Sequence, residues 1–181
     1  YQFRKPGGVL VLYADLAGNG LLVPTTFDWA KLATTRKANL IKLIRGSVCG
    51  PGLPIGKIEG RLLAPLLGPV WAAGVTYESS KFARLNESGS NDGYARVYGA
   101  NRPELFTKGF DEVTVAGHLL PLILPPEAES KIVVTESELA VVANCFGETI
   151  GFTICNDVSQ RDTEGENMLY LPQAKIWGND N

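Results

Sequence analysis

The chain has 181 residues, of which 45% are hydrophobic and 20% are charged, enough apolar material for one soluble domain with a buried core. This composition excludes an intrinsically disordered chain. The formal net charge is only −2, and Lys and Arg are not gathered into a stripe, so nothing indicates a nucleic-acid-binding surface. We therefore expect small molecules or other subunits as partners.

Cysteine usage and hydropathy indicate the compartment. Cys49, Cys145 and Cys155 are an odd number without CxxC spacing, which argues against a disulfide framework or a structural zinc site. The apolar run at residues 62–75 is interrupted by prolines and a glycine and is too short to span a bilayer. No charged-then-apolar signal opens the chain. We expect a cytoplasmic protein with no membrane contact.

The N-terminal part reads as a small α/β subdomain. Residues 8–13 have the apolar character of a buried strand, and residues 17–20 form a glycine-containing turn to a second short apolar run. Apolar side chains at roughly helical spacing predict one helix from about Trp29 to Arg45, capped near Asp28 and stopped by Gly46. We expect this helix to pack on the small sheet.

The Gly/Pro-rich segment at residues 50–57 resembles a phosphate-binding loop only superficially. Pro51 stands where the first glycine should be, and Ile58 replaces the metal-binding hydroxyl. We interpret the segment as a linker, which divides the chain into an N-terminal subdomain, residues 1–58, and a main domain, residues 59–181. The remaining apolar runs predict a mainly β (α+β) fold.

The most informative stretch is an acidic hairpin near the C-terminus. Two β-type runs, residues 139–144 and 149–156, flank a loop that contains Gly147. Glu136 and Glu138 are two residues apart, which places them on one face of a strand about 6 to 7 Å apart, and Asp157 closes the second strand. Three carboxylates without a nearby His or Cys suit Mg2+ or Mn2+ better than zinc. The alternative is an ordinary exposed acidic strand edge.

Several ordered motifs extend this hairpin in both directions. Downstream lie Asn156-Asp-Val-Ser159, Arg161-Asp162, Glu164-Gly-Glu-Asn167 and Tyr170-Leu-Pro-Gln-Ala-Lys175. Upstream lie Val70-Trp-Ala-Ala-Gly-Val-Thr-Tyr77, Ala83-Arg84, Tyr94-Ala-Arg-Val-Tyr98 and Arg102-Pro-Glu-Leu-Phe106. Together they resemble the fumarylacetoacetate hydrolase superfamily over roughly residues 60 to 175, with the closest likeness to its 2-keto-3-deoxy-sugar-acid dehydratase branch. The resemblance implies a mixed β-sheet rolled into a barrel-like domain.

The same resemblance implies a chemistry. A 2-keto-3-deoxy pentonate would lose a C3 proton and its C4 hydroxyl and become a dioxo acid, with Mg2+ stabilising the enolate. By resemblance, Glu104 is the base and Lys175 the electrostatic or proton-donating group. Lys108, Tyr77 and Ser80 are expected to bind substrate, and Lys108 could instead pair with the acidic residues. We expect a 2-keto acid substrate and a homo-oligomer.

Departures from the superfamily keep two alternatives open. Hydrolases that cleave carbon–carbon bonds carry a water-activating His where this chain has Ser80, and the only histidine, His118, lies in an apolar segment typical of a structural residue. Acylpyruvate-type hydrolysis is therefore the second enzymatic hypothesis. The chain does not begin with Met and stops soon after Lys175, so we expect a fragment, weak or inactive alone, and a non-catalytic domain is the third hypothesis.

Overall fold

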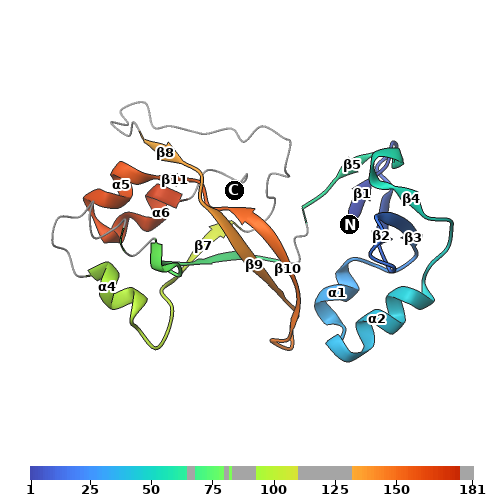
Figure 1. Ribbon diagram of the computed structural model, residues 1–181, viewed down its shortest axis with the longest axis horizontal. Coiled ribbons are helices and arrows are strands. Elements are labelled where there is room, and N and C mark those ends of the chain that lie inside the picture. The colour runs from blue at the N-terminus through green and yellow to red at the C-terminus, as the bar shows by residue number, and fades with distance from the viewer. Residues whose placement is uncertain (65–67, 80–81, 83–92, 110–131, 176–181) are drawn as a thin grey trace. The chain divides into compact units, whose positions relative to one another are not determined.

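The computed structural model describes residues 1–64, 68–79, 82, 93–109 and 132–175 (Figure 1). These residues form two compact units. Within the described part, the first unit holds residues 1–64 and 139–154, and the second holds residues 68–79, 82, 93–109, 132–138 and 155–175. Strands outnumber helices in the described residues, so the prediction of a mainly β chain is confirmed, while the rolling of the sheet into a barrel stays a prediction.

The first unit is organised around one five-stranded antiparallel sheet. Its strands are β1 (Gln2–Arg4), β2 (Leu10–Ala14), β3 (Leu21–Thr25), β4 (Leu53–Pro54) and β5 (Arg61–Leu62), in the spatial order β4-β3-β2-β1-β5. The segment predicted as a linker therefore contributes the edge strand β4 and the 3-10 turn η1 (Ile55–Lys57). Reading that segment as a linker was wrong, because its extended residues Leu53 and Pro54 pair with β3.

Both faces of this sheet are covered. Neighbouring strand residues point to opposite faces, so Leu12 and Tyr13 of β2 enter different apolar clusters. Tyr13 packs with Phe3, Leu22 and Ile58, and its ring meets that of Phe3 edge-on with centroids 5.5 Å apart. Leu12 packs with Phe27 and Leu40, so the helical segment covers that face, as predicted.

The single helix predicted for residues 29–45 is wrong. The structure has α1 (Ala30–Thr34) and α2 (Lys37–Gly46), separated by an extended Thr35 with φ −103° and ψ 134°. The turn of the acidic hairpin supplies the polar partners at this break. Asn144 Nδ2 donates to Thr35 O at 3.0 Å, and Lys37 N donates to Glu148 Oε2 at 2.8 Å. A carboxylate thus caps α2 from a residue 111 positions away.

The acidic hairpin itself forms as predicted. Its strands are β9 (Ser137–Ala143) and β10 (Thr149–Asn156), and Gly147 in the turn adopts a φ of +71°, which favours glycine. Residues 139–154 belong to the first unit, whereas the open end of the hairpin, with Glu138 and Asn156, belongs to the second.

In its described residues the second unit contains two short ladders and several short helical segments. The strands are β6 (Val70–Ala73) with β7 (Leu105–Gly109), and β8 (Val133–Val134) with β11 (Ser159–Gln160). The helical segments are α4 (Gly93–Tyr98), α5 (Arg161–Glu166), η2 (Met168–Tyr170) and α6 (Leu171–Lys175). Helix α6 contacts β7 and β11, so residues far apart in sequence meet there. None of the helices in the described residues has the length and apolar character needed to cross a membrane.

Candidate active site

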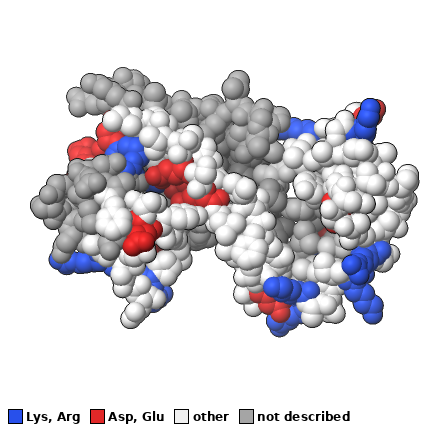
Figure 2. All heavy atoms as spheres, in the orientation of Figure 1, with Lys and Arg blue, Asp and Glu red and all other residues white. Residues whose placement is uncertain are grey.

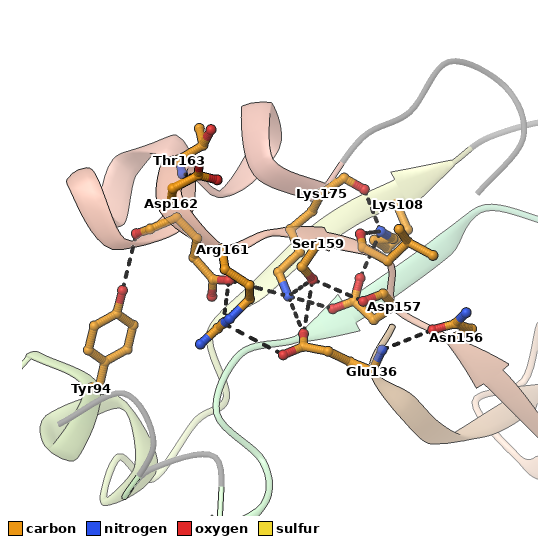
Figure 3. Close-up of polar contacts among 12 residues, drawn as sticks. Tyr94, Lys108, Glu136, Asn156, Asp157, Ser159, Arg161, Asp162, Thr163 and Lys175 are labelled. Carbon is orange, nitrogen blue, oxygen red and sulfur yellow. Dashed lines mark hydrogen bonds and ion pairs between the residues drawn. The ribbon is translucent and has the colours of Figure 1, made fainter. Parts of the chain in front are cut away.

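Charged side chains converge inside the second unit, where strands and short helices end (Figure 3). Glu136 directly precedes β9, Asp157 directly follows β10, and Asp157 N donates to Glu136 O at 2.8 Å, so the two backbones stay paired. Lys175 ends α6 and Lys108 lies in β7. We call the following seven residues the charged cluster: Lys108, Glu136, Asp157, Ser159, Arg161, Glu164 and Lys175.

Lys175 is at the centre of the charged cluster. Its Nζ donates to Glu136 Oε2 at 2.7 Å, Asp157 Oδ2 at 2.9 Å and Ser159 Oγ at 2.6 Å, and the side chain is only 4% exposed. Burial by itself lowers the pKa of this lysine, but the carboxylates of Asp157, Glu164 and Glu136 outweigh burial and raise it. Lys175 is therefore a cation at neutral pH.

Lys108 contacts the same aspartate from β7. Its Nζ lies 2.7 Å from Asp157 Oδ1 and donates to the backbone carbonyls of Val158 and Lys175. The Oδ1 contact is an ion pair without hydrogen-bond alignment, so within the described residues this buried oxygen has no oriented donor. Burial lowers the pKa of Lys108, and the Asp157 carboxylate offsets only part of that effect. Of the two roles left open for Lys108, the structure shows the pairing with an acidic residue.

Arg161 and Glu164 extend the charged cluster at the start of α5. Arg161 Nη1 lies 2.8 Å from Glu164 Oε2 and 3.6 Å from Glu136 Oε1. Glu164 is buried, its Oε2 lies 3.8 Å from Lys175 Nζ, and its backbone carbonyl accepts from Tyr94 Oη at 3.3 Å. Glu136 thus has one oxygen near Arg161 and the other on Lys175, which fixes the orientation of its carboxylate.

Ser159 has no exposed surface and joins both carboxylate residues. Its Oγ lies 3.0 Å from Glu136 Oε2 and 2.9 Å from the backbone carbonyl of Asp157, and it accepts from Lys175. The β8 and β11 pairing holds Ser159 opposite Val134, so its position depends on the ladder rather than on a loop.

Two of the three predicted metal ligands meet in the charged cluster. Glu136 and Asp157 share the Lys175 ammonium, and Glu138 lies close enough for its pKa to be raised by burial and then by the negative charge of Asp157. Across the described residues, no three His, Cys, Asp or Glu side chains are grouped closely enough to form a metal site. The three-carboxylate metal site therefore stays a prediction.

The donor chemistry nevertheless fits a hard cation. The converging atoms are carboxylate oxygens, which Mg2+ prefers, and they already surround a positive charge. Glu136 keeps 25% of its side chain exposed, so the edge of the site reaches solvent. Figure 2 shows acidic side chains at the surface of the second unit.

The remaining predicted residues lie around β6 and β7 or outside the described residues. Glu104 directly precedes β7, its side chain is exposed, and its carbonyl accepts from Gly74 N at 2.8 Å. Tyr77 is 43% exposed and follows Val75, whose φ of 52° is rare for a β-branched residue. Ser80 and His118 lie outside the described residues. The roles of Glu104, Tyr77 and Ser80 stay predictions.

Three members of the charged cluster received no role from the sequence. Ser159, Arg161 and Glu164 belong to the motifs that carry the resemblance, but the resemblance assigned them no function. The available signal was polar and charged residues immediately after an apolar strand, where the structure buries them.

The curated proteins that resemble this chain are named as sugar-acid dehydratases. No family model matches the chain. It is 47% identical over 109 residues to a probable 2-keto-3-deoxyxylonate dehydratase of Haloferax volcanii, with 60% of this chain and 36% of the relative covered. It is also 38% identical over 122 residues to the 2-dehydro-3-deoxy-D-arabinonate dehydratase of Saccharolobus solfataricus, with 65% of this chain and 40% of the relative covered.

The solved structures that resemble this chain are also sugar-acid dehydratases. The apo form of a 2-keto-3-deoxy-D-arabinonate dehydratase matches with a TM-score of 0.66 and 29% identity, over 98% of this chain and 61% of that one. The resemblance to the sugar-acid dehydratases is confirmed. A dehydratase complexed with magnesium and 2,5-dioxopentanoate matches with a TM-score of 0.65 and 28% identity, over 98% and 61% of the two chains. The chain thus spans about two fifths of the curated relatives it matches.

Proposed function

We propose that this chain belongs to a Mg2+-dependent lyase that dehydrates a 2-keto-3-deoxy pentonate to a dioxo acid such as 2,5-dioxopentanoate. The observation that carries the proposal is the buried charged cluster, in which the Nζ of a cationic lysine lies within 3 Å of oxygens of two carboxylates. Support comes from the names of the relatives, which are dehydratases, and from the magnesium and 2,5-dioxopentanoate in one similar structure.

Glu136, Glu138 and Asp157 would hold the metal. When bound there, Mg2+ would supply Lewis-acid stabilisation of the negative charge that forms on the keto oxygen. Arg161 orients the Glu136 carboxylate, and Lys108 holds Asp157 from the other side. These buried contacts preorganise the ligands before substrate arrives.

The chain's other groups would move the protons. In the proposed reaction Glu104 takes the C3 proton, the C4–O bond breaks, and a proton from Lys175 lets the hydroxyl leave as water. The dehydrated product has a C3–C4 double bond and a C5 hydroxyl, and it isomerises to the dioxo acid in two proton shifts. A proton moves from C5 to C3 to give a C4–C5 enol, and the enol proton then moves from oxygen to C4. In the metal-free site the surrounding carboxylates raise the pKa of Lys175, so the lysine carries its proton before the metal binds. Lys108 and Tyr77, with Ser80, are the proposed substrate-binding residues.

The test is product formation from 2-keto-3-deoxy-D-arabinonate and 2-keto-3-deoxyxylonate with added MgCl2, followed by NMR. We expect 2,5-dioxopentanoate, and we expect Glu104→Gln and Lys175→Met to lower kcat/KM by about 100 to 10,000-fold. The exposed residues Glu59 and Lys57 provide the matched controls Glu59→Gln and Lys57→Met, which should keep parental rates. Pyruvate release from acetylpyruvate would instead support the carbon–carbon hydrolase. The cytoplasmic location and the homo-oligomer stay predictions.

A further inference from the structure

The ammonium of Lys175 uses its full hydrogen-bonding capacity on the charged cluster. A lysine Nζ carries three protons, and three oxygens lie within 2.9 Å of it, on Glu136, Asp157 and Ser159. Two of these oxygens belong to predicted metal ligands. Lys175 therefore takes the place that a hard cation would take between the same two carboxylates.

The distances make an undisturbed lysine beside a metal bound to the same oxygens electrostatically unfavourable. A Mg2+ ion coordinates oxygen at about 2.0 to 2.1 Å. Because Nζ lies 2.7 Å from Glu136 Oε2, an ion on that oxygen could lie no farther than about 4.8 Å from Nζ. A dication and an ammonium this close repel each other strongly in a site with little solvent.

Charge balance leads to the same conclusion. The charged cluster holds three carboxylates, Glu136, Asp157 and Glu164, against three cations, Lys108, Arg161 and Lys175. The cluster is therefore neutral without metal when every group is ionised, and the nearby Glu138 adds one negative charge. Adding Mg2+ makes the region net positive by one charge, which favours a cation moving away from the metal.

Glu164 lies near enough to act as a second partner for the Lys175 ammonium. Glu164 Oε2 lies 3.8 Å from its Nζ, beyond hydrogen-bond distance, and the Phe106 ring centroid lies 6.0 Å away. A shift of the side chain toward Glu164 would keep the ammonium paired while it releases Glu136 and Asp157. Lys108 is paired with Asp157 and Arg161 lies near Glu136, whereas Lys175 contacts both carboxylates.

We propose that Lys175 and Mg2+ compete for Glu136 and Asp157, so that the lysine holds the metal-free site together and changes partner when the metal binds. This inference rests on the Mg2+ dependence in the proposed function. It makes Lys175 a residue that weakens metal affinity, in addition to any role in the reaction. The metal then repositions the lysine as it binds.

Isothermal titration calorimetry with MgCl2, on metal-free protein prepared with a chelator, tests the competition. We expect Lys175→Met to bind Mg2+ on the order of tenfold more tightly than the parent, because a competing cation is gone. Lys57→Met, which removes an exposed lysine of the first unit, should match the parent. Equal or weaker Mg2+ binding by a folded Lys175→Met would overturn the competition and leave the metal dependence intact.

A second measurement needs no variant. In the 15N-labelled parent protein, NMR detects the protons of the Lys175 ammonium, which are assigned through the side-chain carbons. We expect this signal to shift strongly when Mg2+ is added. An unchanged Lys175 signal at saturating Mg2+ would overturn the proposal. Failure of the parent and of Lys175→Met to bind Mg2+ at all would overturn both this inference and the metal in the proposed function.

Discussion

Two carboxylates at opposite ends of the same hairpin show how position decides what a glutamate does. Glu148, in the turn, accepts from Lys37 N and Asn144 Nδ2, and its pKa is lowered, chiefly by the Lys37 hydrogen bond. Glu138, at the open end, has its pKa raised, chiefly by burial. The turn carboxylate caps a helix in contact with solvent, whereas the other lies beside buried charges. The contrast separates a structural carboxylate from a candidate functional one.

The largest effect should follow from removing the aspartate that two buried lysines share. Asp157→Ala leaves Lys108 and Lys175, 6% and 4% exposed, without this partner. We expect the free energy of unfolding to fall by about 3–5 kcal/mol, measured by urea denaturation. Glu166→Ala, an exposed residue of the same unit, is the control and should stay within about 0.5 kcal/mol of the parent. A comparable loss in both variants would contradict the account of the cluster.

We expect an effect of intermediate size on stability when the ion pair between Arg161 and Glu164 is broken. Their side chains are 11% and 6% exposed and lie 2.8 Å apart, so each of Arg161→Gln and Glu164→Gln removes the short charge-assisted hydrogen bond that the other residue makes. In a double-mutant cycle we expect a coupling free energy of about 1–3 kcal/mol. If the two substitutions destabilise the protein additively, the pair contributes nothing as a unit.

The smallest effect should come from the exposed turn. Glu148→Gln removes the charge that caps α2, and we expect its thermal midpoint to fall by roughly 2 °C at neutral pH. The folded pKa of Glu148 lies below the ordinary carboxyl value of 4.5, so the ionised form stabilises the fold above that value. This contribution is lost as the pH falls through the folded pKa.

The pH dependence of stability tests whether charge causes the effect of Glu148→Gln. As the pH falls below 4.5 and through the folded pKa, the difference between the parent and Glu148→Gln should shrink, because the parent carboxylate loses its charge there. Glu59→Gln, at another exposed site, should show no difference at neutral or acidic pH. A difference for Glu148→Gln that persists unchanged in acid would mean that packing rather than charge is responsible.

Local patterns in the sequence predicted the hairpin and the strands β2 and β3, because these depend on neighbouring residues. The two β-type runs, residues 139–144 and 149–156, and the glycine turn at Gly147 were sufficient for β9 and β10. The break at Thr35 was not predictable in this way. The groups that satisfy it, Asn144 and Glu148, lie more than a hundred residues away in the chain.

The candidate site, too, was predictable from the sequence only in part. The strand spacing placed Glu136 and Glu138 together, and the resemblance added Lys175, which the structure brings onto Glu136. Neither source indicated that Lys175 would lie directly on the predicted metal ligands. That arrangement depends on how α6 packs against β7 and β11, a tertiary contact with no local sequence signal.

Ser159 has one hydroxyl proton and two acceptors within reach, Glu136 Oε2 at 3.0 Å and the Asp157 carbonyl at 2.9 Å. It can satisfy only one of them at a time, and the charged acceptor makes the stronger bond. When the Glu136 carboxylate turns to another partner, a rotation about the Cβ–Oγ bond moves the proton to the carbonyl. A buried hydroxyl of this kind lets Glu136 exchange partners without leaving an unpaired donor in the core.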